Sequence, residues 1–441
     1  MSNAITPQVS MEGLGRALRS PVPAFILCAA AVVKVCVLFS ILPTRIRQWD
    51  FGQLYAAALV LRENGDPYTN SYASVGATLK IEMTPGYESA EMPTLLLFLE
   101  PLTKLPLERA YWLWTMLNVI CLAVAMFLLL RPSVSGLSPP TAWSLAALGL
   151  LYSPVSVQFE NAQTQIVILI LIAAAMRSMT RSHELAGGFI LATAGLLRGF
   201  PLLLIGYLFV RREWRTFWYS VVGLVIGVVL TWGMVGAPCL SFARAVGWAT
   251  ERVYLQIPVN FAVGAVVSRL FWNSSGFFLG EQFDIVRKIA IVVAYAVILG
   301  FTIRATLATR RKDRDWRAFS LWVISCILLS PIAWFHYFVL LIIPYFQLAI
   351  AGLGGRASKR ALWMAVGSYL LLGVSRTVGS TTRSLYPFIP TLDECGFIAL
   401  MMIYIAAYWC TIDSPDSVRP HVRVPPGELN RGLTLTEHTS R

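Results

Sequence analysis

The chain has 441 residues, of which 56% are hydrophobic and only 13% are charged, and its formal net charge is +13. Soluble domains carry about 25% charged residues, so this composition excludes a set of ordinary soluble domains. The basic residues fall in short clusters between apolar runs, not along one amphipathic face, which argues against nucleic acid as a partner. The composition therefore predicts an all-α polytopic membrane protein with membrane lipids around it.

The two ends of the chain are polar. Residues 1–22 carry Arg16 and Arg19 and are expected to form a cytoplasmic amino-terminal segment. The apolar stretch that follows is longer than the core of a cleavable signal peptide and is expected to remain as the first span. Residues 412–441 are rich in Pro, Arg and Thr without apolar periodicity, which predicts a disordered cytoplasmic tail. Residues 23–411 form the predicted transmembrane domain.

Apolar runs long enough to cross about 30 Å of hydrocarbon recur along this domain. After the first span, membrane segments are predicted at 108–131, 141–158, 162–180, 216–235, 285–308, 317–334, 337–353, 361–377 and 392–411. The apolar stretch 185–210 is interrupted by Arg198, Gly199 and Pro201, which predicts a hairpin of two short helices. The total is about twelve membrane segments, including short or re-entrant helices.

Clusters of basic residues mark the cytoplasmic ends of membrane segments. The clusters are Arg16 with Arg19, Arg131, Arg177 with Arg181, Arg211 with Arg212 and Arg215, the run from Arg310 to Arg317, and Arg356 with Lys359 and Arg360. All of them lie on one side only if residues 185–210 turn back as a hairpin. The threading therefore predicts both termini on the cytoplasmic side of the plasma membrane.

This threading leaves residues 44–107 as the longest external loop. The segments 159–162, 236–284 and 330–337 and the loop near 378–391 lie on the same side. Residues 51–63 are predicted to form an amphipathic helix on the membrane surface, with Tyr55 and Tyr68 at headgroup depth. The apolar residues 91–105 contain two prolines and are predicted to form a re-entrant or interfacial element.

Common enzyme signatures are missing from the sequence. It has no Walker phosphate loop, no dinucleotide-binding GxGxxG, no GxSxG elbow and no HExxH, and its four histidines exclude a His-rich metal site. Neither a metal nor a cofactor is expected. The remaining candidates for chemistry are polar residues at the external membrane edge.

Asp50 and His336 are the candidate catalytic residues. Asp50 lies between aromatic residues just after the first span, where partial burial would raise its pKa toward that of a useful base. Its alternative role is the N-cap of the predicted helix. His336 is the one histidine inside an apolar segment, and it could share a proton with Asp50 or bind a phosphate. Alternatively, it belongs to an interfacial aromatic belt.

Two cations lie inside apolar segments. Arg198 at the hairpin tip needs an anion, and a lipid phosphate is the expected partner because the sequence offers few carboxylates at that depth. A structural pair or snorkelling is the alternative. Lys34, near the middle of the first span, raises the same question, although a long Lys side chain can snorkel.

Amide side chains provide further candidates. Asn161, Gln163 and Gln165 form a polar row at the start of a span and could bind the donor sugar, although amides also join helices to one another. Asn260 and Arg269 lie in an external segment and are candidates for the same role.

Six short motifs follow one another between about residues 45 and 350. They are Trp49-Asp50-Phe51 with Tyr55-Ala56-Ala57-Ala58 and Gly65-Asp66-Pro67-Tyr68; Met92-Pro93 with Glu100-Pro101-Leu102-Thr103-Lys104-Leu105-Pro106 and Trp114; Gln163 to Gln165; Leu197-Arg198-Gly199-Phe200-Pro201; Asn260 with Gly264 and Arg269; and Ser330-Pro331 with Trp334, His336 and Tyr337. In this order they resemble glycosyltransferase family 87, whose members include phosphatidylinositol-mannoside mannosyltransferases. The row Asn161-Ala162-Gln163 departs from the family by lacking its usual glycine.

The resemblance implies a GT-C type membrane fold and a sugar transfer on the external face. The donor would be a polyprenyl-phosphate sugar, usually mannose, which is a substrate and not a cofactor, and the acceptor a glycolipid or another glycan. Asp50 would be the base of an inverting transfer, and a monomer or homo-oligomer is expected. A transporter or flippase of lipid-linked sugars is the alternative, because it would also use intramembrane charge and a broken hairpin. A non-catalytic structural subunit is a third possibility.

Overall fold

The computed structural model describes residues 20–47, 49–69, 71–81, 89, 91–131, 136–250, 255, 259–271, 280–309, 316–382 and 395–412. These residues form helices and connecting loops, with no strand among them, so the predicted all-α class is confirmed for this part of the chain. The predicted tail, the first basic cluster and most of the cluster after residue 309 lie outside the described residues.

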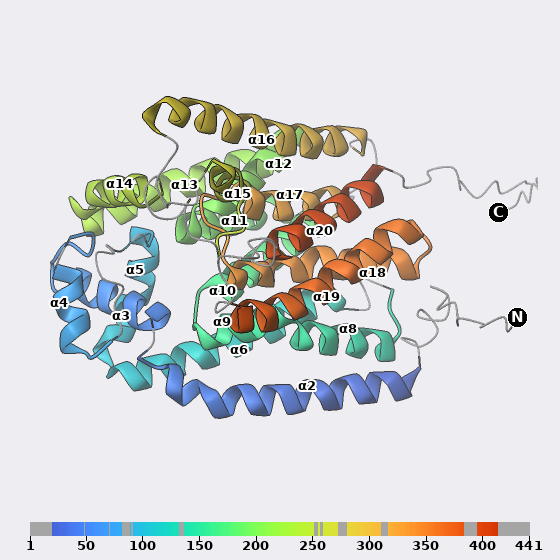
Figure 1. Cartoon of the computed structure of the whole chain (residues 1–441), viewed down its shortest axis with the longest axis horizontal. Helices are drawn as coiled ribbons and strands as arrows, with labels where there is room; N and C mark the ends of the chain where they lie inside the picture. Colours follow the sequence, from blue (N-terminus) through green and yellow to red (C-terminus); the bar gives the residue numbers. More distant parts are fainter. Residues whose placement is uncertain are drawn as a thin grey trace, which may run out of the picture.

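Most of the helices run side by side in one bundle (Figure 1). They are α2 (Pro21–Ile41), α6 (Leu107–Leu130), α8 (Pro139–Leu151), α9 (Ser153–Glu160), α10 (Gln165–Thr180), α11 (Glu184–Arg198), α12 (Leu203–Arg211), α13 (Trp214–Val235), α16 (Gly280–Ala308), α17 (Trp316–Leu328), α18 (Ile342–Leu353), α19 (Lys359–Thr382) and α20 (Cys395–Ile412), with the 3-10 segments η3 (Phe200–Leu202) and η5 (Phe335–Leu341). The start of α2 and the end of α20 lie at the same end of the bundle.

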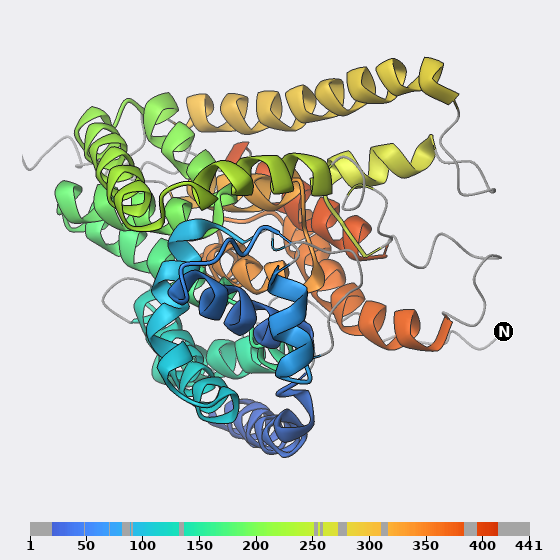
Figure 2. The same cartoon turned by 90° about the vertical axis from the view of Figure 1, so that its left-hand side faces the viewer.

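Short elements cover the opposite end of the bundle (Figures 1 and 2). They are η1 (Leu42–Arg45), α3 (Trp49–Arg62), α4 (Ser71–Thr78), α5 (Pro93–Leu99), η2 (Glu100–Lys104) and α14 (Pro238–Ala249), while α15 (Val263–Leu270) packs beside α16. With seven residues, α5 is too short to cross a bilayer, which agrees with the re-entrant or interfacial element predicted there.

The helix α3 is buried in the protein. It packs against α4, α5, α6 and η2, and the side chains of Phe51, Leu54 and Tyr55 are almost fully buried. The Tyr55 hydroxyl donates to the carbonyl oxygen of Leu105 at 2.7 Å, and Tyr68 is buried as well. The predicted surface helix with tyrosines at headgroup depth is therefore wrong, because neighbouring elements cover the helix on several sides.

Six helices in the described part of the chain are long and apolar enough to cross a membrane. They span Pro21–Arg45, Leu107–Leu130, Trp214–Val235, Asp284–Ala308, Phe335–Leu353 and Cys395–Ile412. A seventh crossing results if α8 and α9, which meet at a bend of 51°, are one broken span, and other apolar helices are shorter. The chain is thus a multi-pass membrane protein, but the predicted count of about twelve segments is not confirmed.

The predicted hairpin is present. Gly188 near the start of α11 packs on Thr216 near the start of α13, and Gly227 farther along α13 packs on Leu196, so α11 and α13 run in the same direction. The intervening α12 must therefore run back. The reversal occurs at Gly199, whose φ of +26° favours glycine. It places Arg198 at the turn.

Lys34 holds the bend between α8 and α9. Its Nζ donates to the carbonyl oxygens of Leu151 at 2.7 Å and Tyr152 at 3.3 Å. The two carbonyls lie at the break between the helices, just before Pro154, and the Tyr152 carbonyl also accepts from the Val155 N–H at 3.1 Å. Lys34 therefore adds a cationic donor to the carbonyls at the bend.

Candidate functional site

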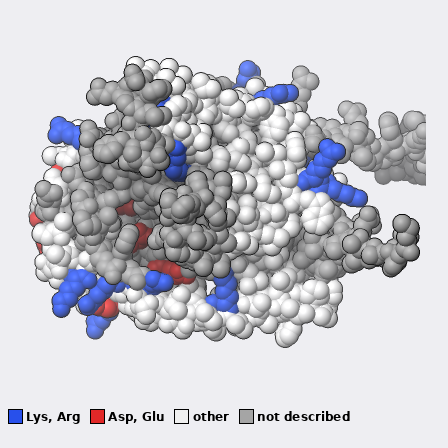
Figure 3. All heavy atoms as spheres, viewed as in Figure 1, with Lys and Arg blue, Asp and Glu red and all other residues white. Residues whose placement is uncertain are grey.

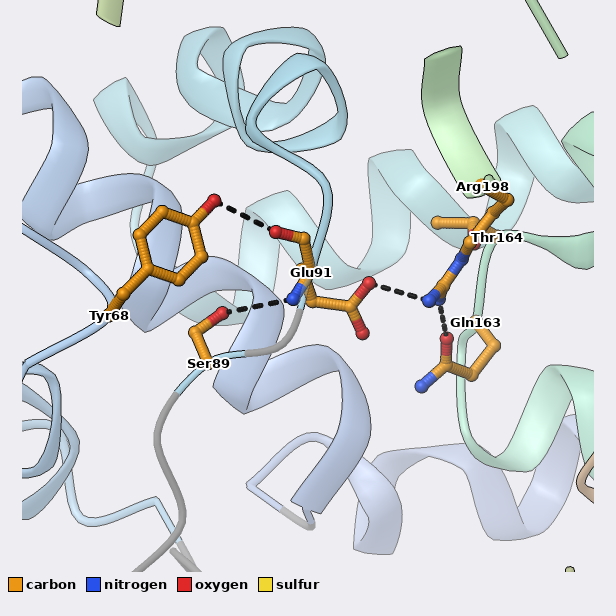
Figure 4. A network of polar contacts seen from close by, with 6 residues as sticks. All are labelled: Tyr68, Ser89, Glu91, Gln163, Thr164 and Arg198. Atoms are coloured by element: carbon orange, nitrogen blue, oxygen red, sulfur yellow. Dashed lines mark hydrogen bonds and ion pairs between the residues drawn. The ribbon is translucent and has the colours of Figure 1, made fainter. Parts of the chain in front are cut away.

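Arg198, the last residue of α11, lies at the centre of a polar network (Figure 4). Its Nη1 forms an ion pair with Glu91 Oε2 at 2.6 Å. Its Nη2 donates to Gln163 Oε1 and its Nε donates to Thr164 Oγ1, each at 2.6 Å. The Arg198 side chain is only 10% exposed and that of Glu91 22%, so the charged pair is largely withdrawn from solvent.

Gln163 connects this ion pair to Asp50 in the first turn of α3. Its Oε1 accepts from Arg198, and its amide group donates to the Asp50 carboxyl. Burial raises the pKa of Asp50 to about 7; the Gln163 hydrogen bond lowers this pKa, the Glu91 charge raises it and the Arg198 charge lowers it. Near neutral pH, Asp50 therefore exchanges a proton readily, as a general base must.

The turn between α9 and α10 presents Gln163 and Thr164 to Arg198. Ala162 in this turn has a φ of +46°, which residues with side chains rarely adopt. The conformation is held because Trp114 Nε1 donates to the Ala162 carbonyl at 2.7 Å and the Gln158 amide donates to the Gln163 carbonyl. The polar row Asn161-Ala162-Gln163 therefore forms this tight turn without a glycine, because Trp114 and Gln158 hold its backbone.

A turn near the end of α3 places Glu91. The carboxylate of Asp66 accepts from the Tyr68 N–H at 2.9 Å, and the Tyr68 hydroxyl donates to the Glu91 carbonyl at 2.8 Å. The hydroxyl of Ser89 lies 3.5 Å from the Glu91 N–H (Figure 4). The motif containing Asp66 and Tyr68 therefore has a structural task, which is to hold the backbone that carries the Arg198 partner.

Glu91 and Thr164 were not predicted as site residues. The sequence indicated that Arg198 needs an anion, but it favoured a lipid phosphate, because few carboxylates were expected at that depth of the membrane. The contact between Glu91 and Arg198 depends on how the segment before α5 packs on the hairpin, which local patterns do not show. The alternative of a structural pair for Arg198 is the one that the described contacts favour.

His336 lies on η5, near the Arg198 end of the network. It is 2% exposed, and its ring packs against those of Trp334 at 5.6 Å and Tyr337 at 5.1 Å between centroids. Phe200, beside the hairpin turn, packs on Tyr337 at 5.2 Å. The charge of Arg198 is close enough to act on His336. This histidine therefore lies in the protein interior, not in an exposed aromatic belt.

Two further amides of the polar row lie around the same turn. Gln165 opens α10 and is fully buried, and neither amide atom makes a hydrogen bond of ordinary geometry, although the Tyr337 hydroxyl is nearby. Buried polar atoms without good partners are uncommon in folded proteins. Asn161 caps the end of α9 and is partly exposed.

Asn260 and Arg269 have structural contacts. Asn260 is fully buried; its Oδ1 accepts from the N–H groups of Ala262 at 3.1 Å and Ala333 at 2.9 Å, and its Nδ2 donates to the Pro331 carbonyl at 2.9 Å. Arg269 donates to the Asn260 carbonyl at 2.9 Å. These contacts join the start of the α15 segment to the residues that precede η5. Binding of sugar or phosphate by these residues, or by Lys34, stays a prediction that the contacts do not support.

Among the residues that the structure describes, no group of three or more His, Cys, Asp and Glu side chains could hold a metal ion. What the site offers is a carboxyl able to take a proton, a largely buried guanidinium, and amides able to bind hydroxyl groups. This combination suits a reaction in which a hydroxyl loses a proton and a negative charge develops nearby.

Comparison with known proteins assigns the chain to a family. No curated protein matches it. The profile of glycosyltransferase family 87 matches residues 92–331, more than half of the chain. This range includes Gln163 and Arg198, whereas Asp50 and His336 lie outside it. The chain belongs to glycosyltransferase family 87.

Proposed function

We propose that this glycosyltransferase transfers a sugar, with mannose as the first candidate, from a polyprenyl-phosphate donor to a glycolipid or another glycan, with inversion of configuration. The observation that carries the proposal is the continuous chain of contacts from Asp50 through Gln163 to Arg198. It joins a base with a pKa of about 7 to a cation in one site. A transfer from a lipid phosphate can use the base to take the hydroxyl proton and the cation to stabilise the departing phosphate.

In this scheme, Asp50 takes the proton of the acceptor hydroxyl as its oxygen attacks the anomeric carbon of the donor. The bond from that carbon to the phosphate oxygen breaks, and its electron pair leaves with polyprenyl phosphate. Attack from the face opposite the phosphate inverts the configuration. A guanidinium has five N–H groups, so the three contacts of Arg198 leave others to bind the departing phosphate, with His336 nearby. The donor is a substrate, and the scheme uses no cofactor.

The site faces the external side of the plasma membrane in this proposal. It lies at the end covered by α3 and α5, opposite the start of α2 and the end of α20 (Figure 1). In Figure 3, acidic side chains are in view only toward the covered end, whereas basic ones are in view at both ends. An excess of positive charge favours the cytoplasmic side, which supports cytoplasmic termini.

The test is sugar transfer by the purified protein. We would supply polyprenyl-phosphate donors carrying labelled mannose or arabinofuranose, with a membrane lipid extract as acceptor. Transfer of label into a glycolipid from one of these donors is expected. Movement of intact donor across a vesicle membrane without any transfer would instead support the transporter.

Glu91→Gln is expected to move the acid limb of the pH–rate profile to lower pH. The substitution removes a negative charge that raises the pKa of Asp50 and leaves the positive charge of Arg198, which lowers it. In the wild type, activity should rise as pH passes about 7, since the base must be deprotonated. Two charged groups act on Asp50, namely Glu91 and Arg198. The titratable side chains of His336 and Tyr337 lie near Arg198.

The measurement is the initial transfer rate of both proteins between pH 5 and pH 9. Glu108→Gln is the matched control, because Glu108 is a half-exposed carboxylate on the same side of the molecule that pairs with Arg47. Its profile should follow the wild type. An unchanged acid limb in Glu91→Gln would show that Glu91 does not influence the base.

Lys34→Met is expected to lower stability without changing the KM for the donor. It leaves the carbonyls of Leu151 and Tyr152 at the α8–α9 bend without their cationic donor, at a cost of about 1.5–3 kcal/mol. Thermal unfolding and donor titration of the purified protein would separate the two effects. An increase in donor KM with unchanged stability would show instead that Lys34 binds donor.

A further inference from the structure

An apolar groove runs along the outside of the bundle between α2, α6, α8 and α9. Its volume is about 650 Å³, and all but three of its lining residues are apolar or aromatic. Phe127 and Trp143 line it and are 58% and 65% exposed, so the groove is open toward the surrounding lipid. A groove of this kind in a membrane protein is filled by hydrocarbon, because water would gain no polar partners there.

The length of the groove fits a lipid chain. Along α6 it extends from Val119 to Arg131, about 18 Å at 1.5 Å per residue. The hydrocarbon core of a bilayer is about 30 Å thick, so one leaflet contributes about 15 Å. A single acyl chain that enters at one membrane edge therefore fits within the groove.

Positive charge gathers at one end of this groove. Arg131, which lines the groove, caps the end of α6, and its guanidinium lies 5.7 Å from the centre of the Phe127 ring. Arg177, in the last turn of α10, lies close enough to Arg131 and Arg181 for both to repel its charge. Arg131 and Arg181 thus both add to the positive field at Arg177, and basic pockets between membrane helices bind anionic headgroups.

We propose that this groove binds a phospholipid with an anionic headgroup. One acyl chain lies against α2, α6 and α8, and the headgroup phosphate contacts Arg131, with Arg177 and Arg181 adding to the field. This proposal does not depend on the proposed function. The donor lipid is not the occupant, because the three arginines lie at the end of α6 opposite the Asp50 site. A phosphate bound there could not reach that base.

The test uses native mass spectrometry of the delipidated full-length protein after addition of phosphatidylglycerol or phosphatidylcholine with identical chains. The wild type should retain phosphatidylglycerol preferentially. Arg131→Gln should weaken this retention about fivefold, since one basic residue near a membrane surface contributes about that factor. Arg131 and Ala123 are exposed, so neither variant disturbs the packed core. Ala123→Trp, which fills the groove from α6, should reduce retention of both lipids.

Two controls match these changes. Arg212→Gln removes an exposed arginine that follows α12, outside the residues that line the groove, and Val229→Trp adds a ring to the exposed face of α13. Both should retain lipid as the wild type does. Equal retention of the two lipids by the wild type would overturn the headgroup assignment. Unchanged retention in Ala123→Trp would overturn the groove as the binding place.

Discussion

Replacing Asp50 by Asn is expected to reduce the rate of sugar transfer by about 10²–10⁴-fold, which is the usual contribution of a general base. Asn has nearly the same shape and can still accept the hydrogen bond from Gln163, but it cannot take a proton from the acceptor hydroxyl. Donor binding should persist, because Arg198 and its partners are unchanged. The measurement is single-turnover transfer together with donor binding, for wild type and variant.

Stability provides an internal control for this variant. The pKa of Asp50 rises from 3.8 to about 7 in the folded protein. Between these two pH values the unfolded chain has already lost the proton that the folded protein keeps, so the free energy of unfolding falls as pH rises. Asp50→Asn should therefore unfold at a higher temperature than the wild type at pH 8, with a smaller difference near pH 5. Transfer at a rate close to that of the wild type would remove Asp50 from the mechanism. A fall in unfolding temperature at pH 8 would contradict its burial.

Arg198→Gln is expected to have the second-largest effect, on both stability and transfer. It leaves the carboxyl groups of Glu91 and Asp50 without the cation that acts on both of them. Breaking a buried pair costs about 3–5 kcal/mol, and the 22% exposure of Glu91 places this case at the lower end. Transfer should fall as well, because the departing phosphate loses a positive partner.

The double variant Glu91→Gln with Arg198→Gln separates these two effects. Removing both charges leaves only Asp50, which is mostly protonated below pH 7, so at pH 6 stability should recover to within about 1 kcal/mol of the wild type. Transfer should remain low, because the cation is still missing. Thermal unfolding and transfer rates of all four proteins provide the comparison. If the double variant also regains transfer, Arg198 has only a structural role. If its stability does not recover, the ion pair is not the source of the loss.

The sequence alone was sufficient for the class of the protein and for its main candidates. Composition and the spacing of apolar runs identified a helical membrane protein, because burial in lipid requires long apolar helices. The interruption at Gly199 and Pro201 identified the hairpin, since these residues break a helix locally. The order of six short motifs identified the family. Asp50, the proposed base, was identified because its carboxyl group lies just after the first span. Signals of this kind lie within a few residues of one another.

The tertiary structure decided which side chains meet. Glu91, Gln163 and Arg198 lie in three distant parts of the chain, and only the packing of the segment before α5 against the hairpin and the α9–α10 turn brings them together. The same packing buried Tyr55 in the protein, and it gave Asn260 backbone partners that no local pattern indicates. The pKa of a carboxyl likewise depends on which distant groups surround it, and therefore only the folded structure could show that Asp50 titrates near neutral pH.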